Sequence, residues 1–210
     1  MDPHAVAPGL VHWTASHPKI GVEVSSYWIE HARVLLDPLL PPGGLGWLAD
    51  AGPPQHVILT NRHHWRHCSE IVARFGCAVW CNELGLHELE GEPGRERVRG
   101  FRAGEVLPGG IESHEVGALC PDETALRFGL PSGAACLAVA DGVVRMGGGP
   151  LAFVPDELIA DTPEQVEAVK RALRAAYRRL CALEWETLLL AHGLPRVGDG
   201  RRQLSAFAGR

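Results

Sequence analysis

The sequence lacks several features that would point to a class of binding partner. Basic residues are in the minority, with 20 Lys and Arg against 25 Asp and Glu, and the formal net charge is −5. Neutralising nucleic-acid phosphates requires a basic face, so this charge balance gives the chain no electrostatic reason to bind nucleic acid. No apolar run approaches the roughly 20 residues that cross a bilayer, and we therefore expect no membrane segment.

Signals for export and for a cysteine scaffold are also missing. Residues 1–10 contain no basic stretch followed by an apolar core, so we expect no secretory signal and a cytoplasmic protein with reduced cysteines. Cys77 and Cys81 have no second pair nearby, which favours small buried side chains over a zinc ribbon. The 210 residues contain no internal repeat, and we expect one domain over 1–210.

Apolar patterning predicts a mixed α/β protein. Strands are expected over residues 21–29, 32–37, 57–60, 77–80, 106–116, 123–130, 135–140, 143–145 and 187–191. The clearest helix is expected over 163–182, where Pro163 suits the first turn and one apolar stripe follows. Shorter helices are expected over 46–50, 67–75, 83–89 and 203–208, and an exposed loop over 90–102. This order indicates two sheet regions rather than a simple alternating doubly wound sheet.

The most informative segment runs from Val57 to His67. An apolar, β-branched run ends at Thr60 and is followed by Asn61-Arg62-His63-His64-Trp65-Arg66-His67. A buried strand that delivers imidazoles to a loop is how many hydrolases assemble a metal site.

Two further segments accompany this one, Ser26-Tyr27-Trp28-Ile29 before it and Leu189-Leu190-Ala191-His192-Gly193 after it. With these three segments, the chain resembles the metallo-β-lactamase-fold superfamily of hydrolases. The resemblance implies an αβ/βα sandwich of two packed β-sheets with helices outside and metal ligands on loops at one edge. The family motif is Thr-His-x-His-x-Asp-His after a strand. Its first His falls on Asn61, its second on His63, its Asp on Trp65 and its third His on Arg66, so the motif is degenerate.

Later family positions are retained in part. The family's Gly-Asp falls on Ala140-Asp141 and its final Gly-His on Ala191-His192, so the Asp and the His are both kept. Another family His falls on Leu119 if residues 120–126 are matched, or on His114 if residues 113–117 are matched. The first alignment needs no insertion and is preferred. Asp37 resembles the family's strand-end Asp, whose implied role is to organise the loop.

Two functions remain open at this point. In the first, His63, Asp141 and His192 hold one zinc or iron ion, and the protein hydrolyses a small ester, thioester, amide or phosphoester. His64 or His114 is then the expected catalytic proton shuttle.

In the second, the protein is catalytically silent and binds a small metabolite or a protein partner without metal. Arg66 cannot ligate a cation, and it replaces the metal charge by pairing with Asp141. Asn61, Trp65, Arg66 and His67 are expected to line the site in either case. An Arg66 side chain directed at Asp141 favours the second function, and one in solvent favours the first. The sequence gives no indication of oligomeric state.

Overall fold

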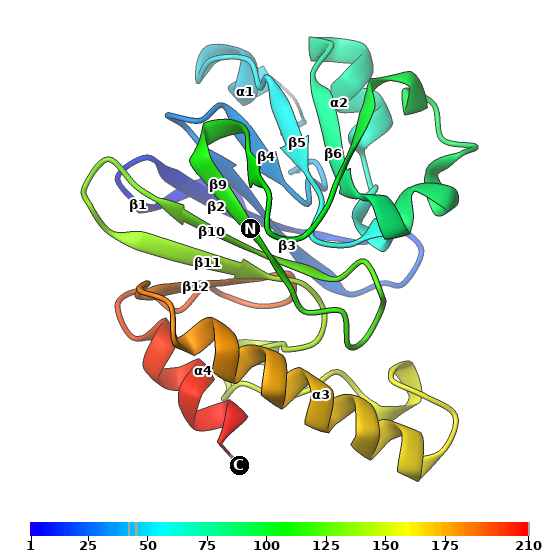
Figure 1. Cartoon of the computed structure of the whole chain (residues 1–210). Helices are drawn as coiled ribbons and strands as arrows, with labels where there is room; N and C mark the ends of the chain where they lie inside the picture. Colours follow the sequence, from blue (N-terminus) through cyan, green and yellow to red (C-terminus); the bar gives the residue numbers. More distant parts are fainter. Residues whose placement is uncertain (42, 45, 210) are drawn as a thin grey trace.

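The computed structural model describes residues 1–41, 43–44 and 46–209. Two β-sheets pack against each other, and helices cover their outer faces (Figure 1). This architecture confirms the predicted αβ/βα sandwich. None of the helices in the described part of the chain is both long enough and apolar enough to cross a membrane.

The first sheet has seven strands that lie side by side in chain order. Neighbouring strands are antiparallel from β1 to β4 and parallel from β4 to β7. The strands are β1 (His4–Ala7), β2 (Leu10–Ser16), β3 (Glu23–Ile29), β4 (Val34–Leu36), β5 (His56–Ile58), β6 (Ala78–Asn82) and β7 (Val98–Phe101). Because β4, β5 and β6 are parallel, their C-terminal ends lie along one edge of the sheet, where open α/β sheets bind ligands.

The second sheet has five strands in the order β12-β11-β10-β9-β8. Only β11 and β12 are parallel neighbours, and the other pairs are antiparallel. The strands are β8 (Val106–Leu107), β9 (Ile111–Glu115), β10 (Thr124–Gly129), β11 (Ala135–Val139) and β12 (Thr187–Leu190). The loops that follow β11 and β12 therefore leave the sheet at the same edge.

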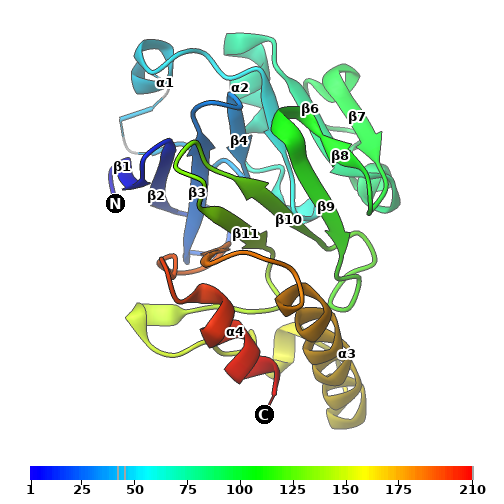
Figure 2. The same cartoon turned by 60° about the vertical axis from the view of Figure 1, so that its left-hand side comes forward.

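Strand alternation divides the core into three layers. In β4, Val34 and Leu36 face the second sheet, whereas Leu35 faces α1 (Gly46–Asp50) and α2 (Cys68–Phe75). The outer face of the second sheet packs on α3 (Pro163–Cys181) and α4 (Gly200–Ala208), which contribute Leu173, Tyr177 and Leu204 to that layer. Figure 2 shows from a second direction that α3 and α4 lie on the side opposite to α1 and α2.

The helix boundaries follow from their end residues. Thr162 precedes α3, and its hydroxyl accepts a hydrogen bond from the backbone N–H of Gln165 at 3.3 Å, while Pro163 occupies the first turn. At the end of α2, Gly76 adopts φ +65°, the left-handed conformation that terminates many helices. The long helix and the end of α2 were therefore predictable from sequence.

Several sequence-based predictions of elements were wrong. β1 and β2 were not predicted, and their burial of His12 and Thr14 obscures the apolar pattern. β7 lies inside the predicted loop 90–102, because Val98 and Phe101 are buried although the residues around them are charged. Val144 and Arg145 form isolated bridges instead of a strand. The short helix expected over residues 83–89 is present with those bounds, as a 3₁₀ helix. The last helix begins at Gly200 and not at residue 203.

Candidate functional site

The candidate site forms where segments from both sheets meet. Asp37 follows β4, residues 61–66 follow β5, Asp141 follows β11, and His192 follows β12. The two sheets are tied together here, because the backbone N–H of Ser25 on β3 donates to the carbonyl of Ala191 after β12 at 2.8 Å. The fold thus brings into one place side chains that are up to 155 positions apart in the sequence.

The centre of the site is His64, a buried side chain between two carboxylates. Its Nδ1 lies 3.0 Å from Oδ2 of Asp37, and its Nε2 lies 3.1 Å from Oδ1 of Asp141. Nδ1 is hydrogen-bonded to the Thr60 hydroxyl at 3.0 Å, and since that hydroxyl donates to Asp37, Nδ1 is the donor. Only an imidazolium donates from both ring nitrogens. Burial lowers the pKa of His64, but the charges of Asp141 and Asp37 outweigh burial and raise this pKa to about 9. His64 is therefore a cation at neutral pH.

Asp37 connects His64 to the strand end. Its Oδ1 accepts from the backbone N–H of Thr60 at 2.8 Å, and its Oδ2 accepts from the Thr60 hydroxyl at 2.6 Å. Burial opposes ionisation of Asp37, but the His64 cation and these hydrogen bonds keep its pKa below the ordinary value. The contacts of Asp37 are those of a residue that organises the loop after β5.

Asp141 receives donors from three side chains. Besides His64, the Nδ2 of Asn61 donates to Oδ2 at 3.0 Å, and Nε2 of His192 lies 3.2 Å from Oδ1. Burial raises the pKa of Asp141, but the charge of His64 and the hydrogen bond from His192 hold it well below its usual range. The Asp141 carboxylate is thus ionised and surrounded by groups of the protein itself.

Arg66 does not make the pair that the sequence suggested. Its Nη1 donates to the backbone carbonyl of Ser25 at 3.0 Å and to that of Asp37. Arg66 adopts φ +45°, and this turn directs the guanidinium to those carbonyls. Among the described residues, the cation paired with Asp141 is His64, so the predicted Arg66–Asp141 salt bridge is wrong. Arg66 is half-buried and is not directed into solvent either.

The other predicted site residues have different surroundings. His63 is exposed at the site, and Trp65 is buried, with its Nε1 donating to Ser69 at 3.0 Å. His67 accepts from the backbone N–H of Leu40 through Nδ1 at 2.9 Å. His114 lies on β9, 3.5 Å from Glu112, away from the cluster around Asp141.

The residues of this cluster do not fit a resident metal ion as they are arranged. Across residues 1–41, 43–44 and 46–209, no group of three or more His, Cys, Asp or Glu side chains is placed to hold one. Asn61, Trp65 and Arg66 occupy three of the family's ligand positions, and none of them is a ligand of zinc or iron. Both oxygens of Asp141 already face donors of the chain, Nδ2 of Asn61 and the Nε2 atoms of His64 and His192, so the carboxylate is not presented to an ion.

Three adjoining hollows open beside the cluster. We call the first the apolar hollow. It has a volume of about 570 Å³, and Asn61, His63, Asp141 and His192 lie at its polar end. Its remaining wall is mostly aliphatic and includes Ile20, Val22, Leu119, Val144, Val154 and Leu158. This volume lies within the roughly 300–1,000 Å³ of small-molecule pockets.

The second, the basic hollow, has a volume of about 370 Å³ and adjoins the apolar hollow at His63, which lines both. Its basic side chains are His17, Lys19, Arg62, His63, Arg66 and His67, and its acidic ones are Glu88 and Glu92.

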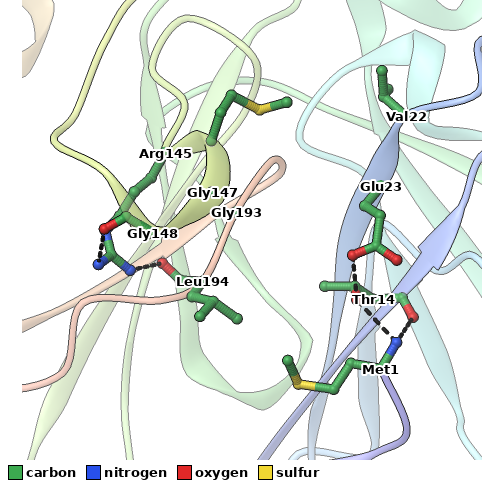
Figure 3. Close-up of a pocket in the computed structure, with 10 residues that line it drawn as sticks. Met1, Thr14, Val22, Glu23, Arg145, Gly147, Gly148, Gly193 and Leu194 are labelled. Carbon is green, nitrogen blue, oxygen red and sulfur yellow. Dashed lines mark hydrogen bonds between the residues drawn. The ribbon is translucent and has the colours of Figure 1, made fainter.

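The third, the edge hollow, has a volume of about 380 Å³ and shares Val22 and Met146 with the apolar hollow. Figure 3 shows it between a wall that carries Thr14 and Glu23 and a wall that carries Arg145 and Leu194. The three hollows therefore form one continuous surface along the edge where the strands end.

Glu123, for which the sequence indicated no role, is buried next to the segment that follows Asp141. Its Oε1 accepts from the backbone N–H of Gly142 at 3.1 Å, and its Oε2 accepts from that of Leu119 at 3.2 Å. Burial raises the pKa of Glu123 to about 7. Glu123 fixes two backbone segments that border the apolar hollow. The signal that could have found it is an acid at the start of an otherwise apolar strand.

Comparison with solved structures identifies the fold. No protein-family model matches this chain, and no curated protein matches it in sequence. Among solved structures, a B3 metallo-β-lactamase with an active-site glutamic acid is similar over 100% of this chain and 86% of its own, with TM-score 0.69 and 19% identity. A metallo-β-lactamase family protein from Thermus thermophilus gives TM-score 0.65 and 17% identity over 98% of this chain and 80% of its own.

A flavo di-iron protein of Thermotoga maritima matches 98% of this chain with TM-score 0.66 and 16% identity, and the match spans 60% of that longer protein. The chain therefore has the metallo-β-lactamase fold. The low sequence identities fit a divergent version of that fold, as the degenerate motif indicated.

Proposed function

We propose that this protein binds a small molecule in the apolar hollow and does so without metal, with the His64 imidazolium in the place of the metal charge. The observation that carries the proposal is the position of His64, 3.0 Å from Asp37 and 3.1 Å from Asp141. The His64 cation offsets one of the two negative charges, and Arg66, whose charge also acts on Asp37 and Asp141, offsets the other, so no metal is needed to hold the acids together. The ligand-binding surface then comprises the apolar hollow and its polar end.

A second function is supported by a different observation. His63, Asp141 and His192, the three side chains expected to hold one zinc or iron ion, all line the apolar hollow. Under this alternative the protein is a hydrolase of the metallo-β-lactamase fold with a reduced site, and its substrate is a small ester, thioester, amide or phosphoester. Asp141 would first have to release the hydrogen bonds that it receives from Asn61 and His64.

Metal content separates the two functions. After dialysis against zinc and then against metal-free buffer, we expect the purified chain to retain no stoichiometric zinc by plasma mass spectrometry. The variant with both His63→Ala and His192→Ala should give the same result as the unchanged chain. One zinc per chain in the unchanged protein, lost in the double variant, would reject the metal-free proposal and establish the three-ligand site.

A further inference from the structure

Exposed apolar side chains gather around the hollows. In the described part of the chain, eight large hydrophobic residues are exposed. Five of them line the apolar or the edge hollow, namely Met1, Ile20, Met146, Leu158 and Leu194. Ile20 and Leu158 are 60% and 69% exposed, so each leaves most of its surface in water. Clustered apolar exposure beside a cavity is typical of a ligand-binding groove, whereas isolated exposed side chains need no explanation.

The basic hollow contains positive charges that lack carboxylate partners. Within the described residues, neither Arg66 nor Lys19 forms an ion pair with an acidic side chain. The contacts of Arg66 are with the backbone carbonyls of Ser25 and Asp37 through one guanidinium nitrogen, Nη1. A guanidinium has five N–H donors in a planar fork, so most of the capacity of Arg66 is free to bind an anion.

One of the two acids of this hollow, Glu88, lies beside Arg62 of the same hollow. Glu88 lies 3.8 Å from Nε of Arg62, and Arg62 also donates to Asp122 through Nη1 at 2.7 Å. Glu92 lines the same hollow, and the acids whose charges act most strongly on Arg66 are Asp37 and Asp141. The pKa of His17, which also lines the hollow, is lowered by burial and then by the charges of Arg66 and Lys19. The local potential at His17 is therefore positive.

The loop between β2 and β3 borders both environments. Lys19 lines the basic hollow, and the next residue, Ile20, lines the apolar hollow. On the opposite side, His63 lines both hollows. The basic hollow and the apolar hollow are thus direct neighbours, both at Lys19-Ile20 and at His63. A single small molecule can contact both hollows.

We propose that the two hollows together bind one amphipathic anion, with a carboxylate or phosphate head at Arg66 and Lys19 and a hydrocarbon body in the apolar hollow. This inference rests on the proposed function and specifies its ligand class. The head is recognised by charge-assisted hydrogen bonds from the guanidinium and the ammonium group. The body is held by removal of apolar surface from water, including the exposed surface of Ile20 and Leu158.

The test is calorimetric titration of the full-length chain with octanoate, octyl phosphate, octan-1-ol, hexanoate and butyrate at pH 7. We expect at least one of the two eight-carbon anions to bind about tenfold or more tightly than octan-1-ol, because the alcohol lacks the charge that pairs with Arg66. From butyrate to octanoate, affinity should rise by about fourfold for each added methylene that is buried.

Exposed residues supply variants that leave the fold intact. Lys19→Gln should weaken octanoate severalfold without changing octan-1-ol, whereas Leu158→Ser should reduce the gain per methylene and leave butyrate unchanged. Arg99→Gln makes the same change of charge at an exposed side chain of β7, outside all three hollows, and should bind like the unchanged protein. Circular dichroism of each variant checks that it is folded.

Equal binding of octan-1-ol and both eight-carbon anions, or no dependence on chain length, would overturn this inference. The zinc content of the same samples is measured in parallel, so that the two proposals fail separately. Metal-free protein that does not bind the anions would reject the ligand class but not the metal-free pocket. Stoichiometric zinc would reject the metal-free pocket itself, and with it the inference that depends on it.

Discussion

His64→Gln is expected to lower the free energy of unfolding by about 3–5 kcal/mol at pH 7, as is typical when one partner of a buried ion pair is removed. The variant would leave Asp37 and Asp141 without the cation that lies between them. The Asp37 side chain is only 6% exposed, so water replaces that cation poorly. Urea denaturation of both proteins measures the difference.

The matched control is His63→Gln, which changes the neighbouring histidine. His63 is exposed and, among the described residues, pairs with no acid through its side chain, so its replacement should change stability by no more than about 0.5 kcal/mol. A loss below about 1 kcal/mol for His64→Gln would contradict the central role given to His64.

The difference in the free energy of unfolding between the unchanged protein and His64→Gln should decrease as the pH rises. The pKa of His64 is raised in the folded state from the ordinary 6.5 to about 9. Its stabilisation is therefore fully present below pH 6.5 and is lost as the pH rises through about 9. The two unfolding free energies should accordingly converge between pH 7 and pH 10.

Gly193→Ala is expected to lower the free energy of unfolding by about 3 kcal/mol, the sum of left-handed backbone strain and overpacking. Gly193 follows His192 and has φ +105°, and an added Cβ would overlap the backbone carbonyl of Arg145. Arg145 pairs with Gly193 in a bridge, and its backbone N–H donates to the carbonyl of His192 at 2.9 Å, so the overlap falls beside His192. Urea denaturation again provides the measurement.

Gly198→Ala is the control for this prediction. Gly198 also has a left-handed φ, +76°, but an added Cβ there meets nothing within 4 Å. Gly198→Ala should therefore lower the free energy of unfolding only through left-handed backbone strain, by about 1–2 kcal/mol. If Gly193→Ala and Gly198→Ala cost the same, the close approach of Arg145 adds nothing to the cost of a side chain at position 193.

The parts of the fold that sequence predicted are those with a clear local period or a clear stop. The helix from Pro163 has one apolar stripe and a capped start, and the strand before Thr60 is a continuous apolar run. The β1–β2 hairpin was missed because polar side chains are buried in it. His12, for example, is fully buried, and its Nε2 lies 3.0 Å from the Ser25 hydroxyl. Such pairing depends on a distant strand and leaves no periodic signal.

The candidate site was predictable only where a family position keeps its residue type. His63, Asp141 and His192 were predicted in this way; their role stays a prediction, and all three line one hollow. The role of His64 between two acids was not predicted from the sequence. It depends on Asp37 and Asp141, which are 104 positions apart and both reach His64 only in the folded chain. The direction of the Arg66 side chain was also not predictable from the sequence, because Arg66 adopts a left-handed backbone conformation.

The most direct test of the account is the protonation of His64, measured by nuclear magnetic resonance on protein labelled with ¹⁵N in its histidine rings. We predict that one imidazole, assigned through its absence in His64→Gln, keeps both ring protons at pH 7 and titrates near pH 9. Addition of zinc should leave its signals unchanged. An imidazole at position 64 that is neutral at pH 7, or one whose signals shift on binding one equivalent of zinc, would contradict the claim that His64 takes the place of a metal.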